Sequence, residues 1–86
     1  MSDDFPFPAP SILTVYGADW CGDCRRAKAL LAARGTPHAY VDLVADAAAQ
    51  RGLQAAGILS IPVVAFPDGR ILIDPPLAEL EAALGA

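Results

Sequence analysis

The chain has 86 residues, of which 55% are hydrophobic, and it carries a formal net charge of -4. A chain of this length forms one small domain, and nearly every apolar position must be used to build its core. The acidic balance, with a pI of about 4.5 and no run of basic residues, excludes a typical nucleic-acid-binding protein.

Prolines at positions 6, 8 and 10 prevent a helix in the N-terminal segment, because each removes a backbone donor and restricts the residue before it. We therefore expect residues 1–10 to form an extended arm and residues 11–86 to form the domain. The opening residues, Met1 to Asp4, are acidic rather than basic. This composition predicts neither a signal peptide nor a membrane span, and hence a cytoplasmic location.

The first half of the domain predicts a strand, a helix and a second strand. Residues 12–16 are hydrophobic and β-prone, whereas residues 22–34 place apolar side chains on one face of an amphipathic helix. Gly35 stands where a helix stop is expected. Residues 38–42 then alternate and end in an acid, as a strand does. The expected buried positions of the helix are Ala27, Leu30 and Leu31.

The next segment predicts a second helix. Asp46 is suited to cap this helix, which runs to about Ala56 and is ended by Gly57. Its expected buried positions are Ala49, Leu53 and Ala56.

The last third predicts a hairpin and a final helix. Residues 61–66 are apolar and β-branched, a Pro-Asp-Gly turn follows at 67–69, and residues 70–73 return as a strand. The segment Asp74-Pro75-Pro76 supplies a cap and two helix-starting prolines. Leucines then recur at helical spacing, at positions 77, 80 and 84.

The element order is therefore βαβαββα. Two strands joined through a helix are expected to be parallel with a right-handed crossover, and the two hairpin strands are expected to be antiparallel. We predict an α/β fold with a mixed four-stranded sheet and helices on both of its faces.

Cys21 and Cys24 are the two cysteines of the chain, and they stand three positions apart at the expected start of the first helix. In a helix their Cα atoms lie within the roughly 4.4–6.8 Å that a disulfide spans. The unpaired N–H groups and the positive end of the helix dipole favour a thiolate at the first of them. We predict dithiol–disulfide chemistry with Cys21 as the nucleophile.

Other roles for two cysteines are weaker. A structural zinc site within one chain commonly takes four ligands, and His38 is the one histidine available, so we expect no metal site. A structural disulfide over so short a loop removes little chain entropy. A carrier of an iron–sulfur cluster or metal, formed as a cysteine-bridged dimer, stays open as the alternative function. Visible absorbance of freshly purified protein distinguishes it from redox catalysis.

Two separated motifs resemble the thioredoxin superfamily, and specifically its small glutaredoxin branch. They are Ala-Asp-Trp-Cys-Gly-Asp-Cys at 18–24 and Gly-Ile-Leu-Ser-Ile-Pro-Val-Val at 57–64. With the element order, the resemblance covers roughly residues 11–86 and implies a thioredoxin-like (glutaredoxin) fold. It also implies that Pro62 follows a cis peptide bond beside the cysteines and that an extended substrate pairs with the backbone there. The expected substrate-binding residues are Trp20, Gly22, Asp23, Ile61 and Pro62.

Departures from the family bear on the substrate. Val15 stands where thioredoxins carry a buried acid. Ala18 stands where glutaredoxins that use glutathione often have a basic residue, and Asp74-Pro75-Pro76 replaces their glycine pair. The Trp-Cys-Gly-x-Cys pattern and the proline-started last helix resemble mycoredoxins, which act with mycothiol.

The resemblance and the thiol pair together predict a glutaredoxin-like or mycoredoxin-like disulfide reductase that serves cell redox homeostasis. Its substrates would be protein disulfides or mixed disulfides of proteins with low-molecular-weight thiols. Cys21 would attack, and Cys24 would resolve the mixed disulfide. We expect a monomer without a bound cofactor, which acts on oxidised proteins. Mycothiol, glutathione or a flavoprotein reductase would supply the electrons.

Overall fold

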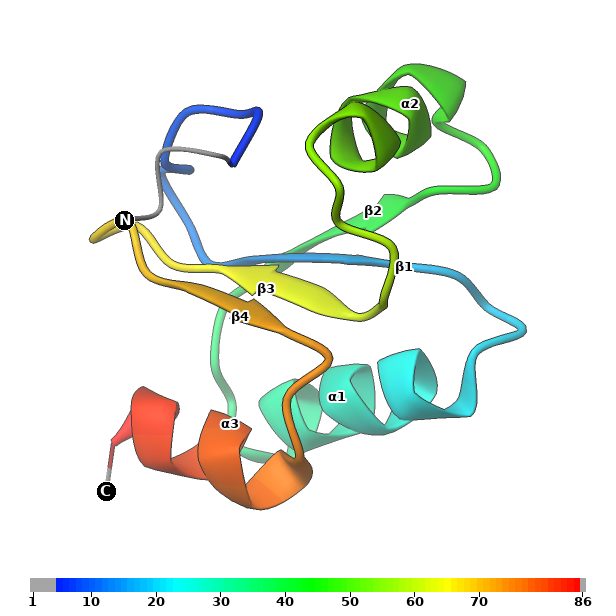
Figure 1. Ribbon diagram of the computed structural model, residues 1–86. Helices are drawn as coiled ribbons and strands as arrows, with labels where there is room; N and C mark the ends of the chain where they lie inside the picture. Colours follow the sequence, from blue (N-terminus) through cyan, green and yellow to red (C-terminus); the bar gives the residue numbers. More distant parts are fainter. Residues whose placement is uncertain (1–4, 86) are drawn as a thin grey trace.

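A mixed four-stranded sheet forms the centre of the computed structural model, which describes residues 5–85. The strands lie in the order β2-β1-β3-β4, with β1 and β2 parallel and β3 antiparallel to both of its neighbours (Figure 1). This arrangement confirms the predicted parallel crossover and the predicted hairpin. The strand bounds are Thr14–Gly17 for β1, Ala39–Asp42 for β2, Val63–Ala65 for β3 and Ile71–Ile73 for β4.

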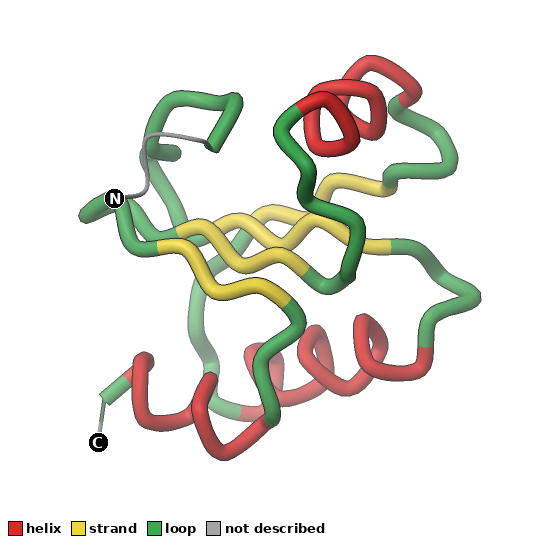
Figure 2. The backbone as a smooth tube through the Cα atoms, viewed as in Figure 1, coloured by secondary structure: helices red, strands yellow, loops and turns green. Residues whose placement is uncertain are grey.

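Helices cover both faces of the sheet, as predicted. Helices α1 and α3 lie on one face, and α2 lies on the other (Figure 2). The observed order βαβαββα is that of the thioredoxin and glutaredoxin fold. Within residues 5–85 no helix is both long enough and apolar enough to cross a membrane. The helix bounds are Gly22–Ala33 for α1, Ala47–Ala55 for α2 and Leu77–Leu84 for α3.

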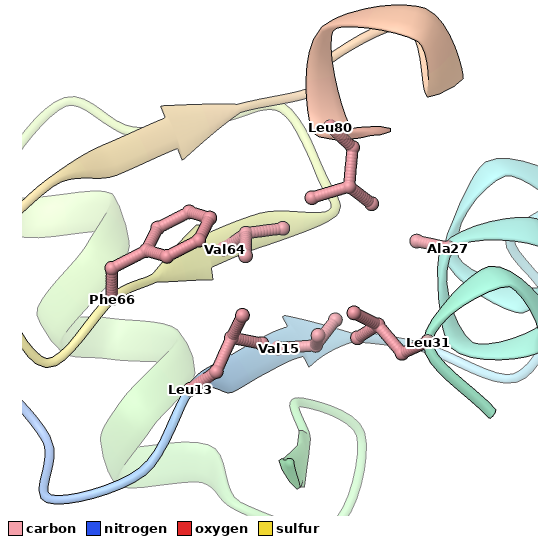
Figure 3. Close-up of a cluster of buried hydrophobic side chains, with 7 residues drawn as sticks. All are labelled: Leu13, Val15, Ala27, Leu31, Val64, Phe66 and Leu80. Carbon is pink, nitrogen blue, oxygen red and sulfur yellow. The ribbon is translucent and has the colours of Figure 1, made fainter. Parts of the chain in front are cut away.

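The sheet separates two hydrophobic clusters. Because neighbouring residues of a strand point to opposite faces, Val15 of β1 faces α1 and α3, whereas Tyr16 belongs to the cluster under α2. Apolar side chains from β1 and β3 are therefore buried on both sides of the sheet. The cluster between the sheet and helices α1 and α3 consists of Leu13, Val15, Ala27, Leu31, Val64, Phe66 and Leu80 (Figure 3).

One of the two predicted helix caps is present. Asp46 precedes α2, and its carboxylate accepts the backbone N–H of Ala49 at 3.0 Å. The prediction that Asp74 caps α3 is wrong. The N-cap of α3 is Pro76, which makes no side-chain hydrogen bond, and Asp74 adopts a left-handed φ of 48° at the end of β4. Two prolines separate its carboxylate from the first turn of the helix, so Asp74 serves the bend rather than the cap.

The described part of the N-terminal arm lies on the domain. Phe7 stacks on Tyr16 with 5.5 Å between ring centroids, and Phe5 meets both rings edge to face. Phe7 also lies over Gly52 of α2, where a Cβ would come within 2.9 Å of its ring. These contacts place residues 5–7 beside the cluster under α2. The first four residues of the predicted arm lie outside the described range.

Candidate active site

Cys21 and Cys24 lie where β1 leads into α1. The turn after β1 closes with a hydrogen bond from the N–H of Cys21 to the carbonyl of Ala18 at 3.1 Å. Cys21 is the N-cap of α1, with extended backbone angles of φ -87° and ψ 115°. Its Sγ accepts the backbone N–H of Cys24 at 3.2 Å. The sulfur of Cys21 therefore occupies the place that a serine or aspartate oxygen usually takes at a helix start.

The two thiols, both free, have different environments. Cys21 keeps 9% of its surface exposed, whereas Cys24 is fully buried. Burial, together with a hydrogen bond to Cys21, raises the pKa of Cys24 to about 12. Negative charge on Cys21 and Asp23 adds to this rise, and a backbone hydrogen bond at Ala18 opposes it. A thiol with so high a pKa stays protonated at neutral pH, so the pair is chemically asymmetric.

Two residues that the sequence analysis did not identify, Tyr40 and Gly17, lie beside Cys24. Tyr40 of β2 has a buried hydroxyl with no hydrogen-bond partner among residues 5–85. Gly17 ends β1, and a Cβ there would lie 2.8 Å from Sγ of Cys24 and 3.0 Å from the hydroxyl oxygen of Tyr40. The register of β2 against β1, in which Tyr40 pairs with Val15, is what places Tyr40 near the cysteines. The sequence offers no separate signal for it.

The basic residues of α1 have identifiable partners. The guanidinium of Arg25 donates to the backbone carbonyl of Asp19 at 2.6 Å, and Arg26 forms an ion pair with Asp23. Lys28 lies over the ring of Tyr40, with its Nζ 3.8 Å from the ring centroid. Asp23 and Arg26 are both exposed, so their ion pair lies at the surface of the helix start.

A groove of about 330 Å³ reaches Trp20, the residue that precedes Cys21 in the chain. Trp20 and Ile61, both predicted substrate contacts, line it together with Leu59. Trp20 is 72% exposed and Leu59 is 78% exposed, which are high values for large apolar side chains. The polar side chains of the lining are two amides of α2, Gln50 and Gln54. None of the described residues that line the groove is charged.

The predicted site residues thus come from two regions of the chain. Gly22 and Asp23 begin α1 between the two cysteines, and Trp20 shares the groove with Ile61. Pro62 is buried at the entry to β3, and the bond between Ile61 and Pro62 is cis, as the resemblance implies. Within the described part of the chain no three His, Cys, Asp or Glu side chains gather in a way that could hold a metal ion.

A thioredoxin-like fold with a CxxC pair at the start of its first helix defines a class of dithiol proteins, and comparisons with solved structures agree with the fold. A thioredoxin-like protein, solved as a point mutant, superposes with a TM-score of 0.75 at 25% identity, covering 87% of this chain and 96% of its own. A glutaredoxin from Archaeoglobus fulgidus has a TM-score of 0.69 at 18% identity, covering 86% of each chain, and shows the same fold.

The sequence comparisons identify the family within this class of thioredoxin-like proteins. The model of the glutaredoxin family matches residues 13–72. Two relatives from strains of Mycobacterium tuberculosis, each provisionally named a glutaredoxin, are 36% identical over 74 residues, covering 84% of this chain and 88% of theirs. The chain therefore belongs to the glutaredoxin family. The family match ends before Asp74, so the Asp74-Pro75-Pro76 segment lies beyond it, whereas Val15 and Ala18, which also depart from family patterns, lie within it.

Proposed function

We propose that this protein is a thiol–disulfide oxidoreductase that reduces protein disulfides, or mixed disulfides between proteins and low-molecular-weight thiols. The observation that carries the proposal is the asymmetry of the thiol pair. The sulfur of Cys21 accepts an N–H of the helix start and the residue keeps 9% of its surface exposed, whereas Cys24 is fully buried and its raised pKa keeps it protonated at neutral pH. The thiol of Cys21 is suited to attack a substrate, and the thiol of Cys24 is suited to stay unreactive until Cys21 has formed the mixed disulfide.

In the first step, the thiolate of Cys21 attacks one sulfur of the substrate disulfide. A bond forms between Sγ of Cys21 and that sulfur, while the other substrate sulfur leaves as a thiolate and takes up a proton. The backbone N–H of Cys24, 3.2 Å from Sγ of Cys21, stabilises the negative charge before the attack. Trp20 and Ile61 border the groove in which the substrate segment would lie.

In the second step, Cys24 attacks Sγ of Cys21 and releases the bound substrate as a thiol. Two of the causes that raise the pKa of Cys24 come from Cys21, namely its hydrogen bond and its negative charge. A sulfur in a disulfide carries no charge, so these causes weaken once the mixed disulfide has formed. Cys24 therefore ionises more readily at the stage at which its thiolate is needed. The resulting Cys21–Cys24 disulfide is reduced by the electron donor.

The groove supports a protein or mycothiol substrate over glutathione. Glutathione has two carboxylates, and the described lining of the groove offers no cation to bind them. Mycothiol has a sugar moiety and no carboxylate, so the amides of Gln50 and Gln54 are adequate partners for its hydroxyl groups. The exposed apolar side chains of Trp20 and Leu59 suit an extended protein segment. We propose mycothiol or a flavoprotein reductase as the electron donor.

The division of roles is tested by trapping. Cys24→Ser, incubated with a mixed-disulfide substrate, should accumulate a stable adduct on Cys21 that mass spectrometry detects. Cys21→Ser should accumulate none and should have no turnover. Adducts found on Cys24 in the wild-type protein would reverse the assignment, and turnover by Cys21→Ser would refute it.

A further inference from the structure

The hydroxyl group of Tyr40 is buried and has no hydrogen-bond partner among residues 5–85. Buried polar groups are paired in the large majority of cases, so an unpaired one requires a physical explanation. Phenylalanine would fill the same space without leaving a polar group unsatisfied. Packing in the reduced protein therefore does not explain why this position holds a tyrosine rather than a phenylalanine.

The position of Tyr40 supplies an explanation. Its strand pairs in parallel with β1 so that Tyr40 lies opposite Val15, on the face of the sheet that α1 covers. From there its hydroxyl and Sγ of Cys24 border the same small space beside Gly17. A Cβ on Gly17 would lie 3.0 Å from the hydroxyl oxygen and 2.8 Å from the sulfur. Because residue 17 is a glycine, no side chain occupies the position that is close to both groups.

The charged and titratable groups around Tyr40 come from three elements. Lys28 of α1 lies over the ring, with its Nζ 3.8 Å from the centroid. Asp19 from the loop before α1 and Asp42 of β2 act on it electrostatically, as do Cys24 and Cys21. Burial and these negative charges raise the pKa of Tyr40 to about 12. At neutral pH the side chain is thus a neutral phenol, which has a proton to donate.

We propose that Tyr40 is a catalytic residue of the resolving step, in which its hydroxyl donates a hydrogen bond to Sγ of Cys24 while that sulfur is negatively charged. The inference rests on the proposed function, in which Cys24 resolves the mixed disulfide. Cys24 loses its proton, the bond between Cys21 and the substrate sulfur breaks, and the Cys21–Cys24 bond forms. The proton passes to the departing substrate thiolate, and Tyr40 keeps its own proton throughout.

The test is Tyr40→Phe, which removes only the hydroxyl. An aromatic disulfide that releases one coloured thiolate when Cys21 attacks and a second when Cys24 resolves reports both steps in one rapid-mixing trace. Tyr40→Phe should leave the first phase unchanged and slow the second about 10-fold at neutral pH, because hydrogen bonds to charged groups are strong. The pH at which the second phase is half-maximal should rise by about one unit. A residue that only fills space would not move that pH profile.

Tyr16→Phe is the matched control, because Tyr16 is a buried tyrosine of the neighbouring strand that lies on the opposite face of the sheet. It should leave both phases unchanged. A second phase in Tyr40→Phe with the wild-type rate and pH profile would overturn the inference. Equal slowing of both phases, together with a lower melting temperature, would reassign Tyr40 to a structural role.

A second measurement does not depend on turnover. In a Cys21→Ser background Cys24 is the remaining thiol, and the carbon NMR shift of its Cβ reports its ionisation as the pH is raised. Adding Tyr40→Phe should raise the midpoint of that titration by about one unit. An unchanged midpoint would overturn the inference even if the wild-type protein reduces disulfides. A raised midpoint in a protein that proves inactive would leave the contact established and the proposed function refuted.

Discussion

The sulfur of Cys21 accepts the backbone N–H of Cys24 at 3.2 Å, so the proposed nucleophile is also the N-cap of the helix that carries its partner. In the proposed mechanism, one atom thus both attacks the substrate and caps α1. Any reaction at that sulfur changes the helix cap, and any substitution at Cys21 changes both properties at once.

Substitutions at Cys21 therefore predict a specific order of stabilities. Cys21→Ala removes the cap acceptor and should lower the free energy of unfolding of the reduced protein by about 0.5–1 kcal/mol. Cys21→Ser keeps an acceptor of the preferred type and should match or exceed the wild-type stability. Urea unfolding under reducing conditions measures both. Equal stabilities of the alanine and serine variants would show that the sulfur contributes nothing as a cap.

The stability of the reduced protein should fall at alkaline pH. The pKa of Cys24 rises from an ordinary value of 9.0 to about 12 on folding. Between these values the unfolded chain has lost this proton and the folded chain still holds it. Stability is therefore fully present below pH 9.0 and falls as the pH rises toward about 12, by up to about 1.4 kcal/mol per pH unit.

The control for this decline is Cys24→Ser, which has no such proton to lose. Tyr40, whose pKa is also raised to about 12, should produce a smaller decline that begins above 10.0 in both proteins. Unfolding free energies measured at a series of pH values check the difference. Parallel curves for the wild type and Cys24→Ser would contradict the prediction.

Gly17 should resist enlargement. The methyl group of Gly17→Ala would lie 2.8 Å from Sγ of Cys24 and 3.0 Å from the hydroxyl of Tyr40, in a space with little freedom. We expect a loss of about 1–3 kcal/mol of stability, as overpacked interiors show. Gly22→Ala is the control, because its methyl group would meet the flexible end of Arg26 at 3.3 Å. In thermal unfolding, the melting temperature of Gly17→Ala should be well below that of Gly22→Ala.

The N-terminal arm should contribute stability without being required for folding. Phe7→Ala removes the ring that stacks on Tyr16 and should cost about 1–3 kcal/mol. Pro6→Ala, at an exposed position of the same arm, should change stability by less than about 0.5 kcal/mol. Deletion of residues 1–10 should leave a cooperatively folded domain, as expected if the domain begins at residue 11. Circular dichroism melting curves check all three, and an unfolded deletion variant would move the domain boundary.

Glutathione mixed disulfides should be poor substrates. The loss of one charge-assisted contact to a carboxylate weakens binding by roughly 10–100-fold. Gln54→Lys places a cation in the groove and should lower the KM for a glutathione mixed disulfide, with less effect on a mycothiol one. Ala48→Lys puts the same charge on α2 but faces a different pocket, so it is the control. Efficient glutathione turnover by the wild-type protein would refute the proposed preference.

Much of the fold could be predicted because its signals are local. The period of apolar residues and the cysteine pair are read from short windows, and so are the Pro-Asp-Gly turn and the Asp46 cap. The prediction for Asp74 failed because residue type suggested a cap, whereas the bend after β4 decided where its carboxylate lies. The strands were predicted longer than they are. Pro62, for example, has no N–H for the ladder, and β3 begins after it.

The sequence by itself determined the element order, the thiol pair and the place of that pair at a helix start, because each depends on residues that are close together in the chain. Only the tertiary structure decided what surrounds the pair. The space shared by Tyr40, Gly17 and Cys24 exists because β2 pairs with β1 in one particular register. The uncharged groove requires α2 and the segment before β3 to lie beside Trp20. Such contacts join residues that are far apart in sequence. They are decided by packing and strand pairing, so the local periodicity of the sequence does not predict them.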